Sequence, residues 1–269
     1  MSISRHPSYV CPVVPIIHLA WLWFTVTLVG AQAHAAEPLC HADALREFEH
    51  TQREVAQTRQ VLLKKYRKAK NNTERQAVLD EGERFIAKQF YTKIAPAWMG
   101  TPWTMAVIND GLKPDARAPH EKDKGVSCSW FVVSVLENLG LRIGNPSGFA
   151  GTIAIHLQRS LSPQKKDLRR FFHKTPAQLR EQMIRWGNGL YIIGLNCHIG
   201  FLYVDGDNVT FIHSSYTAPY KVVMEPIEAS DAIALSEAAG YVVSALFKDN
   251  RLIHHWLTGT RVYFNGPRK

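Results

Sequence analysis

Residues 197–213 read Cys-His-Ile-Gly-Phe-Leu-Tyr-Val-Asp-Gly-Asp-Asn-Val-Thr-Phe-Ile-His, two β-prone apolar runs joined by a polar turn. This pattern predicts a β-hairpin that turns at Gly206-Asp207. The register set by such a turn places Gly200 opposite His213, and it puts His198 diagonally across from His213 on the same face. A slip of one residue would move His213 to the other face of the sheet.

The part of the chain around the hairpin contains several strand-like runs, and the two strands of the hairpin are among them. These runs are rich in β-branched and aromatic residues and are separated by Gly, Asp and Pro. They cover 190–195, 199–204, 209–214, 220–224 and 241–247, with another candidate at 261–264 and a short helix expected at 229–239. Together these runs predict an antiparallel meander.

A nucleophile motif lies upstream of the strands. Residues 125–140 read Gly-Val-Ser-Cys-Ser-Trp-Phe-Val-Val-Ser-Val-Leu-Glu-Asn-Leu-Gly, a small-residue turn that leads into an apolar helix near Cys128. A thiol at a helix N-terminus feels the positive end of the helix dipole, which stabilises the thiolate and lowers its pKa. We assign His198 as the base that accepts the thiol proton, and His213 as the group that orients His198 and fixes its tautomer.

Each of these residues, read alone, is also typical of a buried structural side chain. The order Cys, His, His along the chain favours catalysis. Ser129 is interpreted as a hydrogen-bonding residue at the helix start rather than as a rival nucleophile.

Two amphipathic helices precede the nucleophile motif. Apolar spacing predicts one helix over 41–70, and a second that starts in 71–73, has capping-box spacing from Thr73 to Gln76 and continues to about Phe90. We expect a helical hairpin whose apolar face belongs to the core rather than to a partner surface. The predicted organisation is a hairpin at 36–94 followed by an α+β domain at 95–269.

The first 35 residues differ from the rest of the chain. They contain one Arg, no Lys and no acid, with an apolar run over 16–29 and small residues at Ala33 and Ala35. This composition predicts a cleaved secretory signal peptide over 1–35 and a periplasmic or secreted protein. The alternative is a membrane anchor, but the apolar run is shorter than the roughly 20 residues that a spanning helix needs.

The charge of the chain indicates the kind of partner. It carries 32 basic and 23 acidic side chains, and removal of 1–35 leaves a formal charge of +8. A positive protein outside the cytoplasm suits an anionic partner such as cell-wall polymer or a membrane surface. The basic stretch 157–174 is either a solvated loop or a rim that attracts acidic substrate. No nucleic-acid motif is present, so no nucleic-acid partner is expected.

Three cysteines remain after signal cleavage, an odd count that leaves at least one thiol unpaired. If Cys128 is the nucleophile, Cys40 and Cys197 are the pair available for a disulfide. The alternative for Cys197 is a buried strand residue that points away from His198.

The order Cys-Ser at a helix start, then His-Ile-Gly-Phe-Leu-Tyr-Val-Asp-Gly, then Phe-Ile-His-Ser-Ser resembles the NlpC/P60 cysteine peptidases over roughly 100–247. The resemblance implies a papain-like α+β fold and hydrolysis of peptide stems in peptidoglycan. It also implies that Cys128 is the nucleophile, His198 the base and His213 the polar third member.

The chain departs from this family at three positions near the nucleophile. Ser127 stands where the family usually has an Asp that helps to hold a substrate amine, and Trp130 where it has Gly. Trp103, in Gly-Thr-Pro-Trp, stands where the family carries a tyrosine near the oxyanion site. Trp103, Ser127 and Ser129 are therefore the candidate substrate-binding residues, and backbone N–H groups at Cys128 are expected to support the oxyanion.

Other functions remain open at this point. One is an inactive or regulatory papain-like module that docks on cell wall or protein partners, and another is a thiol acyltransferase or deamidase that uses the same site. No cofactor is expected, because the chain lacks a phosphate loop and a His-Glu-x-x-His motif. His254 and His255 would point to opposite faces of a strand, which argues against a shared metal.

Overall fold

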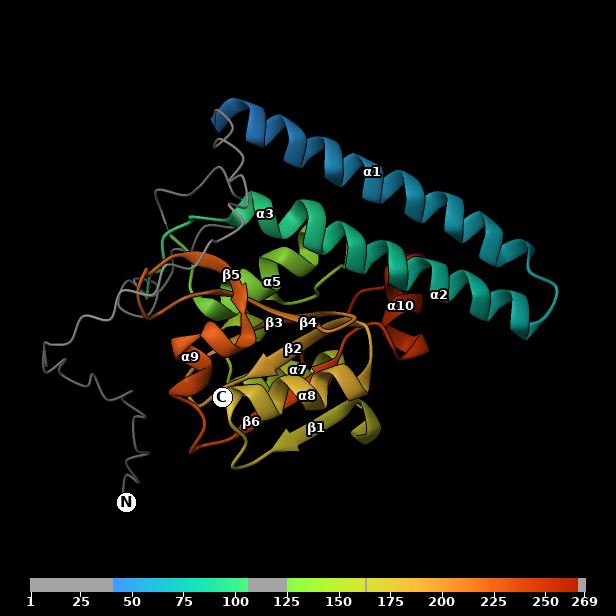
Figure 1. The fold of residues 1–269 in the computed structure, drawn as a ribbon. Helices are drawn as coiled ribbons and strands as arrows, with labels where there is room; N and C mark the ends of the chain where they lie inside the picture. The colour runs from blue at the N-terminus through green and yellow to red at the C-terminus, as the bar shows by residue number, and fades with distance from the viewer. Residues whose placement is uncertain (1–40, 106–124, 163, 266–269) are drawn as a thin grey trace, which may run out of the picture. The chain divides into compact units, whose positions relative to one another are not determined.

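An antiparallel sheet of six strands, in the order β1-β6-β2-β3-β4-β5, forms the centre of the structure (Figure 1). The structure is a computed structural model, and it describes residues 41–105, 125–162 and 164–265. The strands are β1 (Leu168–Phe171), β2 (Gly189–Gly194), β3 (Ile199–Asp205), β4 (Asn208–Ser214), β5 (Val222–Pro226) and β6 (Tyr241–Ala245). The predicted α+β class is confirmed, and the predicted signal peptide and Cys40 lie outside the described residues.

The β3–β4 hairpin has the register predicted from its turn. Asp205 pairs with Asn208 and Phe201 with Ile212, so Gly200 lies beside His213. A methyl group added at Gly200 would lie only 2.8 Å from Cβ of His213 and 2.7 Å from the Phe211 ring. Glycine is therefore required here by close packing, because any larger side chain would push the two strands apart.

The two faces of the sheet belong to two apolar clusters, because successive strand residues point to opposite faces. The first cluster includes Phe201 and Ile212 and packs against the helix that begins at Cys128. The second cluster includes Leu202 and Phe211 and packs against α8 (Pro176–Trp186). Both faces are thus covered, as the near-continuous apolar sequence of β2 requires.

The predicted helical hairpin is α1 (His41–Lys68) and α2 (Asn72–Gln89). Its apolar face is buried in the first cluster together with α5 (Cys128–Asn138), which confirms the core prediction. The cap of α2 lies in the predicted stretch 71–73, but the predicted capping box from Thr73 to Gln76 was wrong. Asn71, rather than Thr73, accepts the N–H of Glu74, and Glu74 in turn accepts the N–H of Lys70.

Shorter helices complete the described part. They are η1 (Phe90–Ile94), α3 (Ala95–Trp98), α6 (Pro146–Ala150), α7 (Ala154–Leu161), η3 (Lys165–Asp167), η4 (Ile227–Ala229), α9 (Asp231–Ala234) and α10 (Asn250–Thr258). The N-terminus of α8 has the capping box that Thr175 and Gln178 predict. No helix in the described ranges is both long enough and apolar enough to cross a membrane.

Four parts of the chain differ from the prediction. The helix expected over 229–239 is divided into η4 and α9, and the candidate strand at 261–264 forms only a single bridge, from Val262 to Ile143. His254 and His255 lie on helix α10 rather than on a strand. The basic stretch 157–174 contains the end of α7, then η3, and then the edge strand β1, which pairs with β6.

Candidate active site

The two histidines of the hairpin form a buried pair. Nε2 of His198 lies 2.7 Å from Nδ1 of His213, and the two rings are 3% and 0% exposed. The contact arises because His198 lies directly before β3 and His213 lies near the end of β4, diagonally across from it. The diagonal contact predicted from the turn is therefore present.

A carboxylate that the sequence did not reveal completes the pair. Nε2 of His213 lies 3.0 Å from Oε1 of Glu225 on β5. Strand β5 pairs with β4 so that Glu225 is opposite Phe211, which brings the carboxylate to the face that carries both histidines. The loop 215–221 between these strands has no simple turn signature, so the sequence alone did not set this register.

The groups have pKa values that make the pair neutral beside an ionised acid. Burial lowers the pKa of His198 well below its usual value, and the neighbouring His213 adds to this effect. Burial also lowers the pKa of His213, although its hydrogen bond to Glu225 opposes the shift. Burial acts to raise the pKa of Glu225, but hydrogen bonding, above all with His213, lowers it overall. Burial favours the neutral form of an imidazole, and at His213 it outweighs the opposing effect of the Glu225 carboxylate.

The order of hydrogen bonds fixes the tautomer of each ring. Ionised Glu225 can only accept, so His213 donates through Nε2–H. Neutral His213 then has its lone pair on Nδ1, which accepts Nε2–H of His198. His198 is left with a lone pair on Nδ1, a buried atom that has no hydrogen-bond partner within the described residues. The hydrogen bonds from Glu225 through His213 to His198 thus leave Nδ1 of His198 as a basic nitrogen that can accept a proton.

Cys128 lies where the sequence predicted, at the first residue of α5, and it is partly exposed. The segment before it is fixed to the end of the sheet. Oγ of Ser214, the residue after His213, donates to the carbonyl of Val126 at 2.6 Å. Trp103 forms a bridge to Val126 from the other side, so both the strand end and the upstream segment position the start of α5.

Gly125 permits this arrangement. Its φ is +70°, and a Cβ there would lie 2.9 Å from the Thr104 side chain and 3.0 Å from the Pro102 carbonyl. A positive φ and a close backbone approach both favour glycine. The small-residue turn before Cys128 is therefore required by the path of the chain, independently of any chemistry.

The two histidines and the Cys128 thiol contact opposite faces of the sheet. His198 and His213 contact the ring of Phe211, which belongs to the second cluster. Cys128 packs against the first cluster. The structure thus brings together the two histidines and Glu225, and it holds Cys128 at the adjoining edge without a hydrogen bond to Nδ1 of His198.

The other predicted site residues flank Cys128. Ser129 donates from Oγ to the carbonyl of Ala150 at 2.7 Å, the helix-start role expected for it. Ser127 is the N-cap residue of α5 and is partly buried, as is Trp103. Trp130 is buried in the first cluster. Tyr216, which the sequence reading did not single out, packs its ring 4.9 Å from that of His198.

The remaining candidates lie elsewhere. Cys197 is exposed in the turn before His198, so the interpretation as a buried strand residue was wrong, and its proposed partner Cys40 is outside the described residues. In the part of the chain that the structure describes, no three His, Cys, Asp or Glu side chains gather in a way that could hold a metal ion, His254 and His255 included.

Comparison with known proteins does not identify the chain. No protein-family model matches it, and no curated protein and no solved structure matches it significantly. Its function therefore has to be inferred from the residues and their geometry.

Proposed function

We propose that the protein is a periplasmic or secreted thiol hydrolase that cleaves amide bonds, with Cys128 as nucleophile and His198 as base. The observation that supports this most directly is the lone pair on Nδ1 of His198, buried and held in one tautomer by His213 and Glu225. An imidazole held this way can accept a proton without first losing one. Cys128, a partly exposed thiol at the first residue of α5, is the nucleophile that we propose for this base.

The reaction follows the usual course of thiol catalysis. Nδ1 of His198 takes the Cys128 proton, and the thiolate attacks the amide carbonyl carbon. The C–N bond breaks as the imidazolium protonates the leaving amine, which leaves a thioester on Cys128. Water then attacks the thioester with His198 as base, releasing the acid and restoring the thiol. Backbone N–H groups at the start of α5 are suited to hold the oxyanion.

The thiol and Nδ1 must come together for this to occur. Catalytic hydrogen bonds are often long in a protein without substrate and shorten in the substrate complex. The hydrogen bond from Ser214 to Val126 ties the segment before α5 to the end of the strand that carries His213.

The proposed substrate is a stem peptide of peptidoglycan. The support is the resemblance to the NlpC/P60 peptidases in the motifs around Cys128, His198 and His213, together with the positive charge of the chain. Trp103 and Ser127 flank the nucleophile and are proposed to contact the substrate. Because Ser127 replaces the family's usual Asp, a substrate held by its free amine is not expected.

The first test is alkylation of Cys128 by iodoacetamide near pH 7, followed by peptide mass spectrometry. A base that activates the thiol should make the reaction about tenfold or more faster in the wild type than in His198→Ala. His50→Ala changes an exposed histidine on α1 and is the matched control, with no change expected. In parallel, Cys128→Ala should abolish hydrolysis of stem peptides while the fold is retained.

Equal alkylation rates in the wild type and in His198→Ala would overturn the mechanism. They would favour the second candidate, a binding module that keeps the scaffold without the chemistry. One observation already favours that alternative: the histidines contact the second cluster and Cys128 the first, on opposite faces of the sheet.

A further inference from the structure

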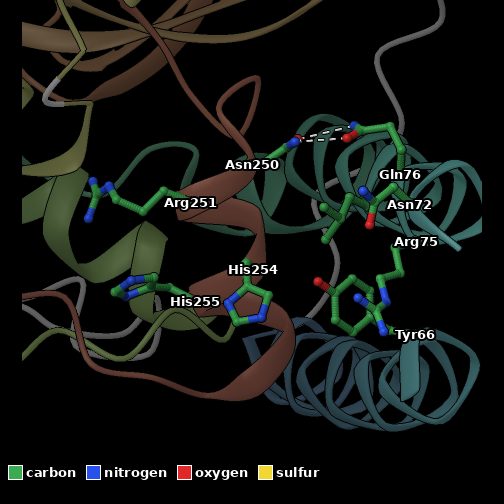
Figure 2. A pocket seen from close by; sticks show the side chains of 9 residues that line it. Tyr66, Asn72, Arg75, Gln76, Asn250, Arg251, His254 and His255 are labelled. Atoms are coloured by element: carbon green, nitrogen blue, oxygen red, sulfur yellow. Dashed lines mark hydrogen bonds between the residues drawn. The ribbon is translucent and has the colours of Figure 1, made fainter. Parts of the chain in front are cut away.

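A second concave site lies far along the chain from the histidine pair, where α1, α2 and α10 meet. It has a volume of about 550 Å³ and is lined by side chains from all three helices, among them Tyr66, Asn72, Arg75 and His254 (Figure 2). This volume lies in the range of cavities that hold small molecules. None of these residues was assigned a function by the sequence.

Four polar side chains line this pocket without a partner among the described residues; Asn72 and Arg75 are exposed, and Tyr66 and His254 are partly buried. Tyr66 and His254 touch each other edge to face, with ring centroids 5.5 Å apart, and Arg75 lies beside Tyr66 (Figure 2). Within the described residues, the side chains of Tyr66, Asn72, Arg75 and His254 make no hydrogen bond or ion pair. Hydrogen-bond donors from α1, α2 and α10 therefore line the same pocket.

The neighbouring polar groups are already satisfied. Gln76 and Asn250 bind each other through two hydrogen bonds, of 3.1 and 2.8 Å, that tie α2 to α10. Arg251 donates to carbonyls at the end of α7 and lies 3.7 Å from Asp249, and its side chain points away from Tyr66 (Figure 2). Glu74, the residue before Arg75, accepts the N–H of Lys70 and the side-chain amide of Asn71, and Asp80, further along α2, accepts from Gln76. The amide pair thus forms a fixed wall, and the unused donors lie beside it.

The lining has one sign of charge. Arg75 supplies this charge, because the other lining arginine, Arg251, lies beside Asp249 and points away; none of the described side chains that form the lining is Asp or Glu. An arginine with no carboxylate partner, beside a hydroxyl, an amide and an imidazole, is suited to a planar or tetrahedral oxyanion. The pocket is much larger than a phosphate ion, so the rest of the ligand must fill it.

We propose that this pocket binds a small ligand that combines an oxyanion with hydroxyl groups, the chemistry of a sugar phosphate or a sugar carboxylate. Arg75 binds the oxyanion. Asn72 and the Tyr66 hydroxyl, which can both donate and accept, bind the hydroxyl groups, and the Tyr66 ring gives the ligand an apolar surface. The inference does not depend on the proposed hydrolase, because no residue of the thiol site lines the pocket.

The test is isothermal titration calorimetry at pH 7 in 150 mM NaCl, a salt concentration that screens unspecific attraction to a positive protein. The probes are glucose 6-phosphate, glucuronate and glucose, which separate phosphate from carboxylate and both from the sugar alone. Binding of at least one of the two anionic sugars is expected, with glucose much weaker. Arg75→Gln should weaken that binding about tenfold or more, since a charge-assisted hydrogen bond is lost.

Arg84→Gln is the matched control, because Arg84 is an exposed arginine on the same helix that does not line the pocket. The Arg84→Gln variant should bind the anionic sugar with the same affinity as the wild type. His254→Gln gives a second variant on another helix and should also weaken binding. The proposal is overturned if neither anionic sugar binds, or if Arg75→Gln and Arg84→Gln have the same affinity.

Discussion

At the scale of single residues, Glu225 decides which nitrogen of His198 carries a proton. Its carboxylate can only accept, and this sets the direction of both hydrogen bonds along the chain to His198. A glutamine amide in its place can also donate a hydrogen bond, so it would no longer fix which nitrogen of His213, and hence of His198, carries the proton. Glu225→Gln should therefore slow both alkylation of Cys128 and any hydrolysis by about 10- to 100-fold, within the range that acid–base catalysis contributes.

The matched control for Glu225→Gln is Glu228→Gln. Glu228 also follows β4 and lies near Arg180 on the surface, 3.6 Å away, but it does not touch a histidine. Its rate should stay within about twofold of the wild type, because exposed ion pairs contribute little. Equal effects of the two substitutions would show that Glu225 acts only through the general charge of the protein.

The same residues make the stability of the fold depend on pH. Burial lowers the pKa of His198 and of His213 below the values of the unfolded chain, near 6.5. The unfolded chain therefore binds more protons as the pH falls below about 6.5, and the folded state is stabilised less. The stability these groups contribute is complete above that pH and is lost progressively below it.

Thermal unfolding followed by circular dichroism at pH 7.5 and pH 5.0 checks this dependence. The wild type should lose several degrees in melting temperature between the two conditions. His198→Asn should be less stable at pH 7.5 but should lose less on acidification, because one buried titrating group is gone. An identical drop in both proteins would assign the pH dependence to other groups.

At the scale of elements, the β3–β4 hairpin and α8 could be predicted because their signals are local. Two turn residues set the hairpin register, and Thr175 with Gln178 forms the helix cap. Helix α10 also carried a local signal that was missed. Leu252, Ile253, Trp256 and Leu257 form one apolar face, and Asp249 caps the helix.

The elements that could not be predicted depend on partners far away in the sequence. Strand β1 is an edge strand with two exposed arginines, and it exists because it pairs with β6 some 70 residues later. Glu225 reaches His213 through the pairing of β4 with β5, which no short turn specifies. Long-range pairings of this kind are set by the complete core, and local patterns do not encode them.

At the scale of the whole described structure, the helical hairpin and α5 share one core. Phe48, Val55 and Leu62 of α1 lie in the same buried cluster as Phe131 and Val135 of α5. Arg59 of α1 donates to the carbonyl of Gly140, just after α5, at 3.0 Å. Helix α10 contacts both helices of the hairpin (Figure 1). The hairpin is therefore expected to unfold together with the sheet.

Leu62 and Val61 test this coupling as a matched pair, because they are neighbours on α1 with opposite exposure. Leu62 is 1% exposed and Val61 is 53% exposed. Leu62→Ala should lower the free energy of unfolding by about 2–5 kcal/mol, the cost of a cavity in a packed core. Val61→Ala should change it by less than about 0.5 kcal/mol.

Urea unfolding measured by tryptophan fluorescence and by circular dichroism distinguishes a shared core from a separable hairpin. Trp98, Trp130 and Trp256 are buried in the first cluster and lie outside α1 and α2, and Trp256 packs on Phe85 of α2, so fluorescence reports on the rest of the fold and on its contact with the hairpin. With a shared core, Leu62→Ala moves both transitions to lower urea by the same amount. If the helical signal shifts while the fluorescence transition stays in place, the hairpin unfolds as a separate unit and its packing on α5 and α10 contributes little to the stability of the sheet.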